Sequence, residues 1–206
     1  MRALIKDILD PRRLPWTYIV VFLAAGIVTA SQTLRDFFVY NRYDIAHGEI
    51  WRIWTGHIVH FGWPHFVADG ALFVVIGWAL ERSHPLCGKV SLVVLPFVVS
   101  ISLFWFDPSM NIYGGLSGVN VGLLVFMACR GWQKNWLDWF WPAILGIHVV
   151  EVFLEIHNHG TGGGAIRFDN PEIHVATVAH IGGAIYGVST WALLAQRARA
   201  AKSDPV

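Results

Sequence analysis

The chain has 206 residues, the length of one ordinary domain, and its composition excludes a water-soluble protein. Hydrophobic residues make up 55% of the chain and charged residues 14%, whereas a soluble domain carries about 25% charged residues. The formal net charge is only +1, so no basic surface for nucleic acid is expected. Cys87 and Cys129 lack the paired spacing of zinc or redox sites. The composition predicts an integral membrane protein.

Six apolar stretches are candidates for membrane spans, since a helix needs about 20 mostly apolar residues to cross the hydrocarbon core. They cover about 16–34, 64–80, 88–106, 116–129, 136–156 and 176–196, the fourth being short. Residues 35–63, rich in aromatic side chains and His, are expected to be partly helical. Residues 157–171 contain four glycines and are expected to form a flexible loop. The predicted fold is all-α: a polytopic bundle of six transmembrane helices.

The distribution of Lys and Arg predicts the orientation of this bundle. With the N-terminus inside, cytoplasmic segments hold eleven of these cations and the opposite side holds four, Arg35, Arg42, Arg52 and Arg167. Cytoplasmic loops of membrane proteins carry such an excess. Both termini are therefore expected in the cytoplasm, and a site near the other face would open to the external side.

One candidate for chemistry is Ser117, which follows two glycines at the start of the fourth span. Glycines let the backbone turn tightly into a helix, and the free N–H groups at a helix start can stabilise an oxyanion. A serine among glycines is also typical of close helix packing, and Gly118 with Gly122 forms such a small-residue stripe. The motif alone leaves both interpretations open.

A second candidate, His180, lies on the sixth span together with Gly183 and Gly187. These three positions share one face of a helix. Small stripes on the fourth and sixth spans would let the two backbones approach closely. That approach would bring His180 within hydrogen-bond reach of Ser117, as a serine–histidine dyad requires.

A third candidate pair is His65 and Asp69, four residues apart on the second span, with His60 just upstream. Positions i and i+4 lie on one helix face. The imidazole could donate to a developing oxyanion. Alternatively, His65 and Asp69 could simply hydrogen-bond to each other in the core.

Depth estimates place the candidates together. Ser117 precedes the cytoplasmic Arg130 by 13 residues, about 20 Å of helix. His180 and His65 each lie 17 residues before a cytoplasmic arginine, about 26 Å. In a hydrocarbon core about 30 Å thick, all three fall in the outer half. The irregular stretch 107–115 must then dip inward, where it is tolerated if it lines a wet cavity.

These residues together resemble the rhomboid family of intramembrane serine proteases. The resemblance covers roughly residues 45–195, within one membrane domain of residues 1–206 with short cytoplasmic tails. The matching positions are Trp51, Arg52, His60, His65, Glu81, Gly115, Leu116, Ser117, Gly118, Ala179, His180, Gly183 and Gly187. The resemblance implies Ser117 as nucleophile, His180 as general base and acid, and His65 as an oxyanion donor beside the Ser117 N–H, supported by Gly115 and Gly118. It implies no cofactor.

The motif at 115–119 and the compact length are also similar to rhombosortases, which process C-terminal sorting tails of exported bacterial proteins. The implied substrates are single-pass membrane proteins in the lipid bilayer, with the bacterial inner membrane as location. One position departs from the family, which commonly has asparagine where this chain has Asp69. An ionised carboxylate cannot donate a hydrogen bond. Asp69 is expected either to donate while protonated, or to be ionised and hold His65 as a charged donor, and we favour the second.

Two other classes of function stay open at this point. A rhomboid-like protein without activity would bind membrane clients, although Ser117 and His180 are both retained. A metal or haem protein is suggested by ten histidines, but no three of them converge at a recognisable ligand spacing. No metal is expected.

Overall fold

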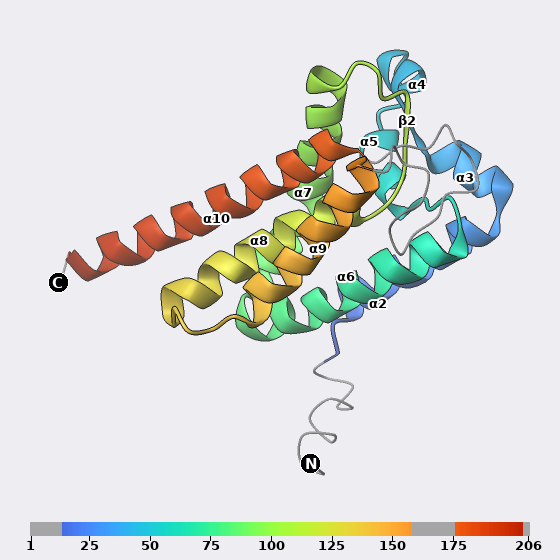
Figure 1. Ribbon diagram of the computed structural model, residues 1–206. Helices are drawn as coiled ribbons and strands as arrows, with labels where there is room; N and C mark the ends of the chain where they lie inside the picture. Colours follow the sequence, from blue (N-terminus) through green and yellow to red (C-terminus); the bar gives the residue numbers. More distant parts are fainter. Residues whose placement is uncertain (1–13, 158–175, 204–206) are drawn as a thin grey trace, which may run out of the picture.

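The computed structural model describes residues 14–157 and 176–203 and is built almost entirely from helices (Figure 1). The long helices follow the predicted apolar stretches in chain order. They are α2 (Trp16–Ala30), α6 (Trp63–Ser83), α7 (Pro85–Phe106), α8 (Ser117–Lys134), α9 (Phe140–His157) and α10 (Thr177–Ser203). The glycine-rich loop predicted at 157–171 lies outside the described residues, apart from His157 at the end of α9.

Within the described residues, three helices are long and apolar enough to cross a membrane: α6, α7 and Thr177–Ala201 of α10. The bent pair of α2 and α3 (Gln32–Phe38) makes a fourth if it counts as one span. The predicted count of six spans is therefore not confirmed. In α9 the apolar stretch found among the described residues is Phe140–Val150, which is shorter than a full span. α8 carries glycines, an asparagine and a basic C-terminal end.

The first predicted span is wrong at its C-terminal end. Instead of one helix to residue 34, α2 ends at Ala30 and the chain bends by 116° into α3. Ser31 adopts an extended conformation, and its side chain accepts a hydrogen bond from Leu34 N at 3.4 Å. A serine cap competes with helix continuation, so this apolar run is broken by a local hydrogen bond that hydropathy does not register.

The segment between α3 and α6 is partly helical, as predicted, and folds around a buried arginine. It contains β1 (Tyr40–Asn41), α4 (Arg42–Ala46), α5 (Arg52–Thr55) and the 3-10 turn η2 (Gly56–Ile58). Arg52 is 6% exposed; it pairs with Glu49 at 2.6 Å and Asp44 at 3.3 Å and donates to two backbone carbonyls of α3 and its C-cap. Its guanidinium thereby fixes the path of the loop that enters α6.

A short antiparallel ladder joins this segment to the chain that enters α8. β1 pairs with β2 (Ile112–Tyr113), with Tyr40 opposite Tyr113. Gly115 N also donates to Gly56 O at 3.4 Å. These bonds satisfy backbone groups of the irregular stretch and hold the start of α8 inside the bundle, since unpaired backbone groups at that depth are costly.

α8 is the central helix of the bundle. Every residue from Gly118 to Ala128 is buried, as expected of a helix that is surrounded on all sides. α8 makes its most extensive contact with α10 and also packs against α6, α7 and α9. The C-terminal part of α10 projects beyond the bundle (Figure 1).

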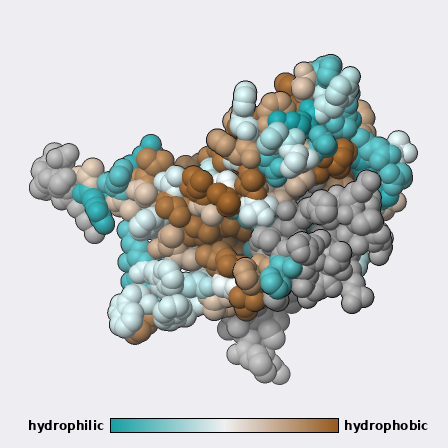
Figure 2. Space-filling view, turned by 45° about the horizontal axis from the view of Figure 1, so that its top comes forward, coloured by the Kyte–Doolittle hydropathy of each residue, from teal (hydrophilic) through white to brown (hydrophobic). Residues whose placement is uncertain are grey.

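The outer surface of the long helices is apolar, as a lipid-facing surface requires. Figure 2 shows a hydrophobic band across the middle of the molecule, with hydrophilic residues toward its ends. Large apolar side chains that are exposed on α2, α7, α9 and α10 include Val20, Leu23, Ile27, Val93, Phe97, Ile147, Phe153, Ile181, Ile185 and Leu193. Soluble monomers rarely expose so much apolar surface. The protein is therefore an integral membrane protein.

Candidate active site

Ser117 and His180 face each other at the starts of two packed helices. Ser117 is the first residue of α8, and His180 lies in the first turn of α10. The Ser117 Oγ is 3.0 Å from His180 Nε2, which is hydrogen-bond distance. His180 is buried and Ser117 is half-buried. The structure thus brings together the two residues proposed from sequence as a dyad, although 63 positions separate them.

Glycines bring α8 and α10 close enough for this contact. A Cβ atom added at Gly183 would lie 2.1 Å from Gly118 O, and one at Gly187 would lie 2.4 Å from Gly122 O. On the facing helix, a Cβ at Gly118 would lie 3.1 Å from Ala179 O, and one at Gly122 would lie 2.8 Å from Gly183 O. The backbones touch along both stripes, so no larger side chain fits at this contact.

The turn before Ser117 also depends on a glycine. Gly115 has a φ of +127°, which L side chains rarely adopt. A Cβ at this position would lie 2.8 Å from His65 Nε2 and 3.1 Å from Asp69 Oδ2. Gly115 is therefore required both by its backbone conformation and by the close approach of α6.

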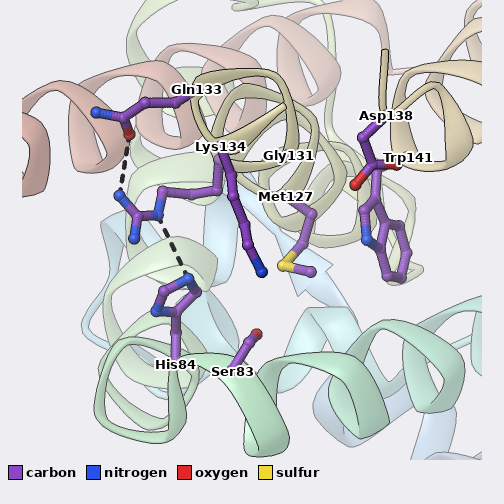
Figure 3. Close-up of a pocket in the computed structure, with 9 residues that line it drawn as sticks. Ser83, His84, Met127, Gly131, Gln133, Lys134, Asp138 and Trp141 are labelled. Atoms are coloured by element: carbon purple, nitrogen blue, oxygen red, sulfur yellow. Dashed lines mark hydrogen bonds between the residues drawn. The ribbon is translucent and has the colours of Figure 1, made fainter. Parts of the chain in front are cut away.

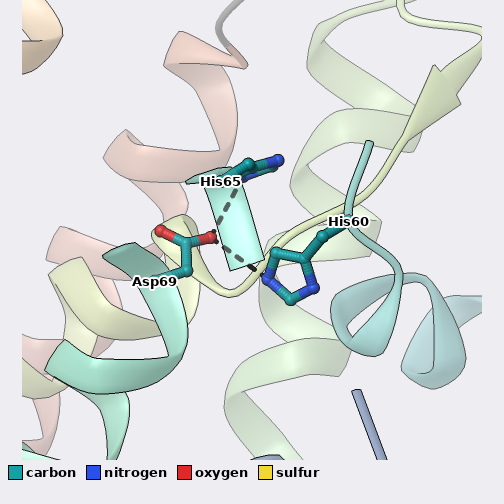
Figure 4. A group of neighbouring side chains, drawn as sticks. All are labelled: His60, His65 and Asp69. Atoms are coloured by element: carbon teal, nitrogen blue, oxygen red, sulfur yellow. Dashed lines mark ion pairs between the residues drawn. The ribbon is translucent and has the colours of Figure 1, made fainter. Parts of the chain in front are cut away.

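Asp69 holds this turn through its side chain. Its Oδ2 accepts a hydrogen bond from Leu116 N at 2.9 Å, and it lies 3.2 Å from His65 Nε2 and 3.5 Å from His60 Nε2 (Figure 4). Asn120 donates to the Asp69 carbonyl at 3.0 Å. Asp69 acts here as an acceptor, as expected if it is ionised and holds His65 and not if it donates while protonated.

His65 is turned toward Asp69 in this structure. Its Nε2 lies 3.2 Å from the carboxylate oxygen Oδ2. The ring also lies against Gly115, two residues before the nucleophile candidate. His65 is therefore close to the turn that presents Ser117, and its role as oxyanion donor stays a prediction.

Three further residues of the site were not assigned a role from sequence. Asn120 is fully buried on α8 and ties that helix to α6; its signal was a polar side chain inside an apolar span. His148 on α9 lies edge-to-face against His180, with ring centroids 5.7 Å apart. His60 joins His65 and Asp69 because the loop before α6 turns back, and sequence spacing does not give the path of a loop.

A separate cavity of about 620 Å³ lies at the C-terminal end of α8, away from Ser117. Figure 3 shows the residues that line it. Its lining includes His84, Arg130, Lys134 and Asp138. Arg130 Nε donates to His84 Nε2 at 3.3 Å. Burial and the neighbouring guanidinium lower the pKa of His84, which keeps the imidazole neutral and able to accept. This cavity belongs to the end predicted to face the cytoplasm and does not include the serine–histidine pair.

The fold and the site define a class: an α-helical integral membrane protein with a serine and a histidine at the buried contact of two helices. Similarity to known protein families identifies a narrower group within this class. A rhomboid domain model matches residues 47–197, and the chain belongs to the rhomboid family.

Two relatives show the extent of the similarity. The chain is 29% identical over 166 residues to the rhomboid protease GluP of Bacillus subtilis, covering 79% of this chain and 29% of GluP. It is 28% identical over 148 residues to Rhomboid-related protein 1 of Caenorhabditis elegans, covering 68% of this chain and 39% of that protein. The chain thus spans less than half the length of either relative.

Proposed function

We propose that this protein is an intramembrane serine endopeptidase that cuts a peptide bond in or beside a transmembrane segment. The observation that carries the proposal is the 3.0 Å contact between Ser117 Oγ and His180 Nε2, inside the part of the chain that matches the rhomboid domain. A nucleophile and base within hydrogen-bond reach are the requirement for acyl transfer. The similarity to a rhomboid protease supports the same reaction class.

In the first half of the proposed reaction, His180 Nε2 takes the Ser117 proton while Oγ attacks the scissile carbonyl carbon. The tetrahedral intermediate collapses when His180 gives that proton to the leaving amine, leaving an acyl-serine. Water then attacks the acyl group as His180 takes its proton, and return of that proton to Ser117 Oγ releases the acid. No acidic third partner is assigned, as in other dyads.

The oxyanion would be stabilised at the start of α8. The first N–H groups of a helix have no intrahelical acceptor, and they carry the positive end of the helix dipole. Ser117 N–H is thus available beside its own Oγ, while the preceding Leu116 N–H is held by Asp69. Gly115 and His65 complete this proposed oxyanion region from the turn and from α6.

The proposed substrates are single-pass membrane proteins, reached within the lipid bilayer. We further propose a bacterial inner membrane location, both termini in the cytoplasm and an active site open to the external side, because the cation distribution supports that orientation. Within the family, the motif at 115–119 supports a rhombosortase that processes C-terminal sorting tails.

A serine-reactive fluorophosphonate probe tests the proposal without a known substrate. Purified wild-type protein in detergent should be labelled at Ser117, which peptide mass spectrometry would locate. Ser117→Ala should not be labelled, and His180→Ala should be labelled far more slowly because the base is missing. Folded wild-type protein that stays unlabelled while still capturing membrane proteins would instead indicate a client-binding rhomboid-like protein.

A further inference from the structure

Three potential metal ligands converge beside the proposed serine site (Figure 4). One potential ligand atom from each of His60, His65 and Asp69 lies within 4.8 Å of the other two. His60 comes from the loop before α6, and the other two lie on successive turns of that helix. The three residues are 0%, 7% and 5% exposed. This group is called the His-His-Asp cluster below.

We propose that the His-His-Asp cluster binds a transition-metal ion of the Zn²⁺ class, and that the bound ion inhibits the serine site. The inhibitory part rests on the proposed function, whereas binding does not. Two imidazoles and a carboxylate are a common zinc ligand set when one position is left for water. Neutral imidazole nitrogen suits Zn²⁺ far better than Mg²⁺ or Ca²⁺, which prefer oxygen ligands.

Two of the three ligand–ligand distances fit tetrahedral coordination. With ligand bonds of about 2.0 to 2.1 Å, the edges of a tetrahedron are about 3.3 Å long. The two edges from Asp69 Oδ2 measure 3.2 Å to His65 and 3.5 Å to His60. For the remaining edge, one ligand nitrogen of each imidazole lies within 4.8 Å of the other, so the histidines must move closer together on metal binding.

His60 supplies a second observation that points to a ligand. Its side chain is fully buried, and within the described part of the chain its Nε2 lies 3.5 Å from Asp69 Oδ2 without hydrogen-bond geometry. A buried polar atom left without a hydrogen bond costs about 1 to 3 kcal/mol. A metal ion at the cluster would satisfy Nε2, the nitrogen that points toward Asp69.

The surroundings of the cluster would hold its ligands in place. Asp69 Oδ2 already accepts Leu116 N–H, and Asn120 fixes the backbone of the same residue. Hydrogen bonds to ligating carboxylates of this kind orient them and raise metal affinity. Two of the three ligands are one helical turn apart on α6, so little ordering is needed before binding.

Inhibition follows from the ligands that the ion would use. A metal on His65 Nε2 occupies the lone pair of that nitrogen, which then carries no proton and cannot donate to an oxyanion. The ion would also coordinate Asp69 Oδ2, the oxygen that accepts Leu116 N–H. This would weaken the hydrogen bond that holds the residue before Ser117. Micromolar Zn²⁺ should therefore reduce fluorophosphonate labelling of Ser117, and a chelator should restore it.

Metal binding is tested on intact protein in detergent, by calorimetric titration with Zn²⁺ and by the absorption spectrum with Co²⁺. Wild type and Ser117→Ala should each bind one ion per chain, with a tetrahedral Co²⁺ spectrum. His60→Gln and Asp69→Asn should each weaken binding by at least about 10-fold. His47→Gln is the matched control, because His47 is exposed on the loop segment and packs against Tyr43, outside the cluster. This variant should bind the ion as wild type does.

Each outcome separates the two proposals. The metal site is overturned if wild-type protein binds no ion. It is also overturned if His47→Gln weakens binding as much as His60→Gln does. The proposed inhibition is overturned if a chelator abolishes fluorophosphonate labelling of Ser117 instead of restoring it. If metal-free wild type fails to label at Ser117 but binds one ion, the serine reaction is wrong and the metal site stands. The number of Zn²⁺ ions bound per wild-type chain shows whether the protein binds metal, even if a variant does not fold.

Discussion

At the scale of single residues, Asp69 connects three parts of the site. Its carboxylate reaches His65, His60 and Leu116 N–H from one oxygen, and its carbonyl accepts from Asn120. An oxygen that accepts Leu116 N–H and lies 3.2 Å from His65 Nε2 is better placed to accept as a carboxylate than to donate as an acid. This geometry supports the account in which Asp69 orients His65 over the account in which a protonated Asp69 donates to the oxyanion.

Asp69→Asn tests that account in metal-free protein. Asparagine can still accept from Leu116 N–H but has no charge to hold His65. Turnover should therefore fall by about 10- to 100-fold, which is a smaller loss than complete removal of an oxyanion donor causes. Asp69→Leu removes the acceptor as well and should lower turnover further. Cleavage of a membrane substrate measures both, and an unimpaired Asp69→Asn variant would refute the orienting role.

His148 is expected to position His180 through ring contact. The edge-to-face geometry at 5.7 Å is one in which aromatic pairs contribute about 0.5 to 1.5 kcal/mol. His148→Ala should therefore lower turnover by roughly 2- to 10-fold, whereas His148→Phe keeps a ring and should retain most activity. Equal loss in both variants would show that the imidazole nitrogens, not the ring contact, matter.

At the scale of elements, hydropathy was sufficient to locate the long helices, because an apolar run of that length has few other stable conformations. It did not give the break at Ser31, which depends on one side-chain hydrogen bond. The β1–β2 ladder has only two residues a strand, too few to carry an alternating pattern. The paired glycines predicted the approach of α8 to α10, while the position of His60 depends on a loop path that no periodicity encodes.

The contact between α8 and α10 should be intolerant of larger side chains. Gly183→Leu and Gly187→Leu place atoms where backbone oxygens of α8 already lie, so the helices must separate and activity should be lost. Gly146→Leu on α9 is the matched control, because a Cβ there meets no atom within 4 Å. Normal turnover in both α10 variants would mean that this contact does not align Ser117 with His180.

The turn η2 is joined to α7 through a buried histidine whose charge state affects stability. His57 Nε2 lies 3.0 Å from Pro96 O and from Ser100 Oγ, and burial lowers the pKa of His57 to about 4. Between pH 6.5 and 4 the unfolded chain binds a proton at this position that the folded protein does not, so stability falls as the pH decreases, by up to about 3 kcal/mol.

Thermal unfolding in detergent at several pH values checks this expectation. His57→Gln keeps a side chain that can donate to Pro96 O but does not titrate, so its unfolding temperature should depend less on pH over this window. Parallel curves for wild type and variant would contradict the assignment of the acid sensitivity to His57.

At the scale of the whole molecule, the two ends of the bundle carry different chemistry. The serine–histidine pair lies at the start of α8, and the basic cavity with Arg130 and Lys134 lies at its other end. A membrane protein of the predicted orientation places the basic end in the cytoplasm. The site would then open to the external side, where water and exported substrates are found.

Reporter fusions test this orientation. A reporter after Val206 should be cytoplasmic, and one inserted at residues 160–164, which lie outside the described residues, should be external. The insertion site is a predicted loop, so it should leave the helices intact. The opposite result would place the serine site near the cytoplasmic face and overturn the depth estimate.

The most direct test of the central claim is cleavage of a single-pass membrane protein by metal-free enzyme reconstituted in lipid vesicles. Wild type should cut at one position in or beside the transmembrane segment. Ser117→Ala and His180→Ala should each abolish this cleavage while remaining folded by circular dichroism. Cleavage that persists undiminished in either variant would contradict the assignment of Ser117 and His180 as the catalytic pair.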